Sequence, residues 1–111
     1  MQVSCHCGNQ TIRVAKPDEV TVCTCSICRR YGAIWGYYAP GDAEIQSNGE
    51  SAYAWGDKDI EFVRCDLCGC VTHYRTRPDH STPVVAVNFR MVDAAEIADI
   101  PVREFDGANL L

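Results

Sequence analysis

The chain has 111 residues, a length that fits one domain with a modest hydrophobic core. Ten lysines and arginines stand against fifteen aspartates and glutamates, so the formal net charge is −5. This acidic balance argues against a nucleic-acid-binding surface, which neutralises phosphates with basic side chains. No apolar run approaches the roughly 20 residues that a membrane-spanning helix needs, and we expect no contact with a membrane.

The first half of the chain predicts short strands separated by turns. Residues 10–15 alternate and carry β-branched side chains, and Lys16-Pro17-Asp18 ends the run. A strand at 20–23 enters a cysteine-rich loop, where Ser26 is positioned to cap a helical turn that Gly32 ends. Further strands are predicted at 33–39, 43–47, 51–55, 60–64, 71–76 and 84–89.

Residues 93–100 form the one candidate for a longer helix. Apolar residues at 94, 97 and 98 have helical spacing, and Pro101 ends the segment because proline cannot continue a helix. A last strand is predicted at 102–105. Short strands at this spacing predict a mainly β fold of the sandwich or barrel-like type, and we expect one domain over residues 1–111.

Eight cysteines in so short a chain either form disulfides or bind metal. Met1-Gln2-Val3-Ser4 leads directly to Cys5 without an apolar run, so we expect no secretory signal and a cytoplasmic location. Thiols in the reducing cytosol bind metal more often than they form disulfides. A secreted form with paired cysteines is the alternative, and its pairing cannot be deduced from the sequence.

Two cysteine turns carry a glycine directly after their last thiol: Cys5-His6-Cys7-Gly8 and Cys65-Asp66-Leu67-Cys68-Gly69. Zinc bound by four thiolates holds the sulfurs roughly 3.8 Å apart, a separation that residues in a tight turn reach. Glycine permits the left-handed backbone that curls amides toward the second sulfur. We therefore predict one structural zinc site that joins the two turns. Its ligands are Cys5, Cys7, Cys65 and Cys68.

The remaining cluster is Cys23-Thr24-Cys25-Ser26-Ile27-Cys28. Three protein ligands with an exchangeable fourth position are typical of catalytic zinc sites. An open position accepts water or an incoming thiol, and zinc lowers the pKa of either. We predict a second zinc on Cys23, Cys25 and Cys28 and assign these three residues the catalytic role.

A closed second site is the alternative, because structural zinc sites usually have four protein ligands. Cys70 is the chief candidate for the fourth ligand, with His73 or His6 behind it. With both sites closed, the chain would be a non-enzymatic, zinc-stapled binding module. Redox sensing through the C-x-x-C pairs is a third possibility, which metal binding would mask.

Arg29 and Arg30 directly follow Cys28 and form a local basic pair. A guanidinium matches a carboxylate in geometry, so both arginines are candidates for substrate binding. Alternatively, they balance the thiolate charge or lie in solvent. Five aromatic residues could line a pocket beside the open site, although aromatic residues on strands more often pack in the core: Trp35, Tyr37, Tyr38, Tyr53 and Trp55.

The three cysteine segments together resemble the signature of the glutathione-dependent formaldehyde-activating enzyme (GFA) family. That signature is C-x-C-G near the start, then C-x-C-S-x-C-R-R, then C-x-x-C-G. This chain carries the three parts at residues 5–8, 23–30 and 65–69. Residues 85–89 and 101–107 also look like the family's closing segment, so the resemblance covers Cys5 to Gly107.

The resemblance implies two zinc ions per chain, one structural and one catalytic, on the two cysteine sets described above. It implies a β-tent-like fold of stacked antiparallel sheets. The implied activity is that of a carbon–sulfur lyase, which reversibly joins a thiol, typified by glutathione, to formaldehyde. The expected partner is therefore a small-molecule thiol such as glutathione.

Overall fold

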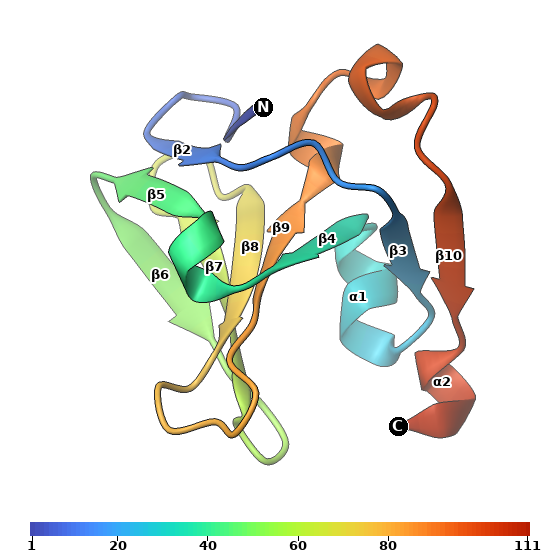
Figure 1. Ribbon diagram of the computed structural model, residues 1–111. Coiled ribbons are helices and arrows are strands. Elements are labelled where there is room, and N and C mark those ends of the chain that lie inside the picture. Colours follow the sequence, from blue (N-terminus) through green and yellow to red (C-terminus); the bar gives the residue numbers. More distant parts are fainter.

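The computed structural model, which describes residues 1–111, consists of two β-sheets with little helix (Figure 1). The smaller sheet has three strands in the order β1-β2-β5: β1 (Gln2–Ser4), β2 (Gln10–Arg13) and β5 (Glu44–Ser47). The larger sheet has seven strands in the order β10-β3-β4-β9-β8-β7-β6. These are β3 (Val20–Cys23), β4 (Trp35–Tyr38), β6 (Glu50–Tyr53), β7 (Ile60–Cys65), β8 (Val71–Thr76), β9 (Val85–Asn88) and β10 (Val102–Phe105). The predicted mainly β fold is confirmed.

One strand pair departs from the predicted antiparallel arrangement. Strands β3 and β10 run parallel, with Val20 opposite Val102 and Cys23 opposite Phe105, whereas the other pairs are antiparallel. A parallel pair needs a long connection between its strands, and here most of the larger sheet lies within that connection. The pairing brings the C-terminal segment beside the cysteine-rich loop that follows β3 (Figure 1).

The predicted strands match observed ones, with their ends shifted by at most two residues. Strand β1 has no predicted counterpart, because three residues are too few to display an alternating pattern. The helical elements are all short and none is long and apolar enough to span a membrane. They are α1 (Ser26–Tyr31), η1 (Pro40–Asp42), η2 (Phe89–Met91), η3 (Ala94–Ile97) and α2 (Gly107–Leu110).

Two details of the predicted helices are wrong. Ser26 does not cap α1; Cys25 occupies the N-cap position, and Ser26 is the first helical residue. The helix predicted at 93–100 is the 3₁₀ turn η3, whose capping box joins Asp93 and Glu96. An eight-residue segment whose apolar side chains are mostly alanine does not supply the packed face that a longer helix needs. Gly32 ends α1 with a φ of 64°, which confirms its predicted role.

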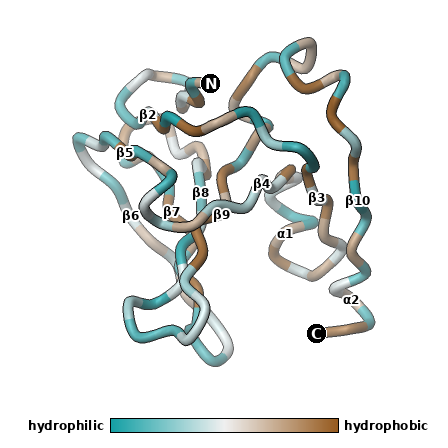
Figure 2. Tube along the Cα trace, viewed as in Figure 1, coloured by the Kyte–Doolittle hydropathy of each residue, from teal (hydrophilic) through white to brown (hydrophobic).

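A buried apolar cluster lies beneath the smaller sheet and includes the inward face of β9. Apolar residues concentrate on β9, whereas the loop from β8 to β9 is hydrophilic (Figure 2). Phe89 is fully buried, and a Cβ at Gly36 would lie 2.4 Å from its ring, so this position of β4 requires glycine. The cluster consists of Val3, Ile12, Val14, Val20, Ile34, Val85, Val87, Phe89 and Ile100.

A buried polar chain joins the two sheets. The hydroxyl of Thr72 on β8 donates to Oε1 of Gln10 on β2 at 2.8 Å, and Nε2 of Gln10 donates to Ser47 on β5 at 3.0 Å. His73 Nδ1 lies 2.9 Å from the Thr72 oxygen. Because the hydroxyl hydrogen already goes to Gln10, Nδ1 of His73 is the donor in this contact. His73 Nε2 is then an unprotonated acceptor, buried without a partner.

Burial lowers the pKa of His73 to about 4, against an ordinary value of 6.5. Between these values the unfolded chain binds a proton that the folded chain does not, so stability falls as the pH drops from 6.5 toward 4. We predict that this histidine removes about 2 kcal/mol of unfolding free energy between pH 7 and pH 5. Urea unfolding at the two pH values measures the loss. His73→Asn, which retains a donor for Thr72, should lose about 2 kcal/mol less, and an unchanged pH dependence would contradict the prediction.

Candidate metal centres

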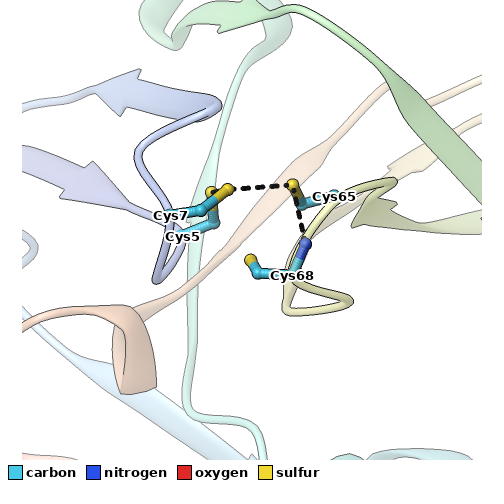
Figure 3. Close-up of side chains that lie close together, drawn as sticks. All are labelled: Cys5, Cys7, Cys65 and Cys68. Carbon is cyan, nitrogen blue, oxygen red and sulfur yellow. Dashed lines mark hydrogen bonds between the residues drawn. The ribbon is translucent and has the colours of Figure 1, made fainter.

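The first centre forms where the loop after β1 meets the turn between β7 and β8. The sulfurs of Cys5, Cys7, Cys65 and Cys68 point toward one another from these two segments, and all lie within 4.8 Å (Figure 3). The Sγ–Sγ separation is 3.7 Å between Cys5 and Cys7 and 3.5 Å between Cys7 and Cys65. These separations fit the edges of a ZnS₄ tetrahedron, which are roughly 3.8 Å. The four residues could therefore hold a metal ion such as zinc.

Both turns have the backbone that the glycines predict. Gly8 and Gly69 have φ values of 82° and 79°, in the left-handed region that side chains disfavour. The turn that ends at Gly69 aims two amides at Cys65: Leu67 and Cys68 donate to its Sγ at 3.3 and 3.5 Å. The Cys68 amide, followed by that of Leu67, lowers the pKa of the Cys65 thiol. The local fold thus favours the thiolate that a metal requires.

Cys70 lies beside this first centre but outside the group of four. The Cys65 amide donates to the Cys70 carbonyl at 3.0 Å, which closes the turn. The amide of Cys70 in turn lowers the pKa of the Cys68 thiol to about 5, from an ordinary value of 9.0. All eight cysteines are free thiols in the structure.

The second centre lies at the start of α1. Cys23 ends β3, Cys25 is the N-cap of α1, and Cys28 lies inside the helix. Their sulfurs lie within 4.8 Å of one another, and all three residues are buried. They could hold a metal ion such as zinc, and we refer to them below as the cysteine trio. One helical turn and the preceding strand end are enough to bring the three together.

No fourth cysteine, histidine or carboxylate joins the cysteine trio. The three fourth ligands considered for a closed site lie elsewhere. Cys70 is beside the first centre, His6 is in the loop of that centre, and His73 is inside the protein on β8. The trio could thus supply three protein ligands, and all three of its cysteines line the adjoining cavity.

Trp35 is the direct neighbour of the trio on β4. Its indole N–H donates to Cys28 Sγ at 3.3 Å, and the tryptophan is 1% exposed. The amide of Cys25 donates to Cys23 Sγ at 3.5 Å. Burial raises the pKa of the Cys28 thiol far above its ordinary value. A cation held by the trio would supply the charge needed to stabilise a thiolate there.

Gly107, at the start of α2, packs directly on the trio. A Cβ at this position would lie 2.6 Å from Cys23 Sγ and 3.0 Å from Cys25 Cβ. Thr24 holds the segment in place, because its hydroxyl donates to Asp106 Oδ1 at 2.9 Å. The parallel pairing of β10 with β3 delivers this segment, so Gly107 is a site residue that spacing alone does not reveal.

A cavity of about 440 Å³ opens over the trio. Its wall combines the cysteine loop, β4, β7, β8, the loop after β6 and the C-terminal segment. The lining residues are Cys23, Thr24, Cys25, Ser26, Ile27, Cys28, Arg29, Trp35, Tyr37, Trp55, Ile60, Phe62, Tyr74, Phe105, Gly107, Ala108 and Leu111.

The structure separates the two candidate substrate-binding arginines. Arg29 lines the cavity and is the one charged residue that does so. Arg30 does not line it; its Nη1 donates to the carbonyl of Ser26 at 2.9 Å, one turn back along α1. Only Arg29 is therefore placed to meet a molecule in the cavity.

Only some of the aromatic residues considered for the pocket line the cavity. Trp35, Tyr37 and Trp55 line the cavity, whereas Tyr38 and Tyr53 do not. Tyr38 instead donates its hydroxyl to the carbonyl of residue 15 at 2.6 Å. Four further wall residues come from strands whose facing direction the sequence pattern does not reveal: Ile60, Phe62, Tyr74 and Phe105.

Comparison with known proteins supports the fold. A crystal structure of a Rhodobacter sphaeroides protein, a structural-genomics target, matches with a TM-score of 0.73 and 27% sequence identity. The match covers 93% of this chain and 100% of the other. No family model and no curated protein matches the chain. The arrangement of the two sheets is therefore found in an experimental structure, and the likeness assigns no activity.

We predict that Cys65→Ser removes one metal ion and unfolds the protein. Serine does not provide a thiolate, and a structural zinc contributes on the order of 10 kcal/mol, as much as the whole stability of a small domain. Circular dichroism and metal quantitation measure the two losses. Cys70→Ser is the matched control, since Cys70 lies beside the centre but outside its ligand set. Equal losses of metal and of folded structure in the two variants would contradict the assignment of the ligands.

We also predict that Gly107→Ala lowers the metal content from about two ions per chain to about one. The added Cβ would collide with Cys23 Sγ at 2.6 Å, whereas the first centre is distant from this contact. Gly41→Ala is the control, because a Cβ there meets nothing within 4 Å. Full metal content in Gly107→Ala would show that α2 does not constrain the trio.

Proposed function

We propose that the protein is a zinc-dependent enzyme of the carbon–sulfur lyase type. It would reversibly join a small thiol to formaldehyde or a related aldehyde, as the resemblance to the GFA family implies for glutathione. The supporting observation is the cysteine trio, which has three buried sulfurs, no fourth protein ligand, and a cavity over its free side. This is the arrangement of catalytic rather than structural zinc sites.

In the forward reaction, the thiol sulfur bonds to the carbonyl carbon, and the carbonyl oxygen takes the proton that the sulfur releases. The reverse reaction breaks the C–S bond and returns the proton to sulfur. Cys23, Cys25 and Cys28 would hold the zinc ion, which lowers the pKa of a thiol at its fourth position and so supplies a nucleophile at neutral pH.

The surrounding residues orient the trio and keep water away. The Trp35 N–H fixes the position of the Cys28 sulfur from the interior side. Phe62 is fully buried beside Trp35, with ring centroids 6.2 Å apart, and Phe105 pairs with Cys23 across β10 and β3. A thiol that enters this cavity therefore loses its hydration, which strengthens its electrostatic interactions at the site.

The alternative, a binding module with two structural zinc sites, requires a fourth protein ligand at the trio. No side chain of a suitable type lies within 4.8 Å of the three sulfurs. The two functions therefore predict different zinc coordination: one ZnS₄ and one ZnS₃ with a light atom for the enzyme, and two ZnS₄ for the module.

We predict that the wild-type protein accelerates the approach to equilibrium between a thiol, formaldehyde and their hemithioacetal. Cys25→Ser should return the rate to background, because the trio loses a thiolate ligand. The rate is followed by proton NMR exchange between the thiol and its hemithioacetal. The two proteins are compared at matched folding and at matched metal content of the first centre. Equal rates for the two proteins, or an X-ray absorption spectrum with two ZnS₄ sites, would refute the enzymatic function.

A further inference from the structure

The cavity over the trio is far more apolar than a site for a charged peptide thiol requires. Of its 17 lining residues, 13 are hydrophobic when the three cysteines of the trio are included, and outside the trio Arg29 has the one charged side chain. No aspartate or glutamate lines the wall. Ligand sites commonly combine an apolar wall with a few placed polar groups that select the ligand. The chemistry of this wall therefore restricts the thiols that it accepts.

Glutathione carries two carboxylates and one ammonium group, and each needs a partner when it leaves water. An unpaired charge in an apolar site is costly, and one buried without compensation raises the free energy by several kcal/mol. Arg29 can pair with one carboxylate, but no aspartate or glutamate side chain is present on the wall to pair with the ammonium group. The cavity thus offers the second carboxylate no basic side chain and the ammonium group no acidic one.

The aromatic residues of the same wall are suited to contact an aromatic ring of a ligand. Trp35 and Tyr74 pack edge to face with centroids 4.8 Å apart, and Phe62 and Tyr74 do so at 5.4 Å. Tyr37 continues the cluster, 6.3 Å from Tyr74. Aromatic rings attract one another in offset and edge-to-face arrangements beyond their area of contact. A ring bound here would extend a cluster that the fold already builds.

The mouth of the cavity carries two exposed aromatic residues. Tyr37 is 44% exposed and Trp55 is 47% exposed, and both belong to the lining. Trp55 lies in the turn between β6 and β7, where its carbonyl accepts from the amide of Lys58 at 3.0 Å. These side chains leave apolar surface in water at the point where a ligand would enter, and an aromatic ligand would cover it.

We propose that the substrate of the trio is an aromatic thiol, or the hemithioacetal formed from one, with at most one carboxylate. The inference rests on the proposed function, since it takes the free side of the trio as the place where the sulfur binds. The ring lies against Tyr37, Tyr74 and Trp55, and a carboxylate, where present, meets Arg29.

Tryptophan fluorescence tests the proposal directly, because the chain has two tryptophans and both line the cavity. The metal-loaded protein is titrated with 2-phenylethanethiol, 4-(mercaptomethyl)benzoate and glutathione, and calorimetry gives the dissociation constants independently. We expect both aromatic thiols to bind at least about tenfold more tightly than glutathione. Glutathione binding as tightly as the aromatic thiols would overturn the proposal.

Matched variants locate the interactions. Trp55→Ala should raise the dissociation constants of the aromatic thiols about fivefold and leave that of glutathione unchanged. Tyr53→Ala is the control, since Tyr53 is also 47% exposed but lies outside the lining. Arg29→Met should weaken the binding of the carboxylated thiol alone, and Arg30→Met is its control. If Trp55→Ala weakens the binding of no thiol, or weakens the binding of all of them equally, the ring does not bind where we place it.

These outcomes separate the ligand class from the reaction. Selective aromatic binding without hemithioacetal turnover supports the ligand class and refutes the lyase activity. Turnover that is faster with glutathione than with 2-phenylethanethiol supports the lyase activity and overturns the ligand class.

Discussion

The structure depends on the meeting of two cysteine turns that are distant in the sequence. Cys7 and Cys65 are 58 residues apart, yet their sulfurs lie 3.5 Å from each other. Close-packed thiolates repel one another unless a cation lies between them, so this arrangement is favourable only when a metal neutralises it. A metal there connects the loop after β1, at the edge of the smaller sheet, to the turn between β7 and β8 of the larger one. A small domain with a modest core gains stability from such a link.

The cysteine trio has a different relation to the fold. Its sulfurs come from one short segment, the end of β3 and the first turn of α1, so they need no long-range contact to gather. Long-range structure determines what surrounds them instead. Strand β4 brings the Trp35 N–H to Cys28, and the parallel pairing of β10 with β3 places Gly107 against Cys23. The short segment therefore provides the three sulfurs, and the larger sheet positions the residues that surround them.

The two centres therefore differ in how many sulfurs they gather and in what surrounds those sulfurs. Four sulfurs complete a tetrahedron at the first centre, and their turns aim amides at the sulfurs. At the second centre, three sulfurs face a cavity whose wall is apolar except for Arg29 and a few hydroxyl groups. The fold thus brings four thiols together at one centre and three at the other.

The sequence by itself determined the local features of this protein. Alternation and turn residues predicted the strands to within two residues, and cysteine spacing with Gly8 and Gly69 predicted which thiols share a centre, because these signals act within one turn or strand. Only the tertiary structure decided that β10 runs parallel to β3, that Arg29 but not Arg30 reaches the cavity, and that no fourth ligand joins the trio. These properties depend on which strands become neighbours, and strand pairing between distant segments leaves no periodic signal in the chain.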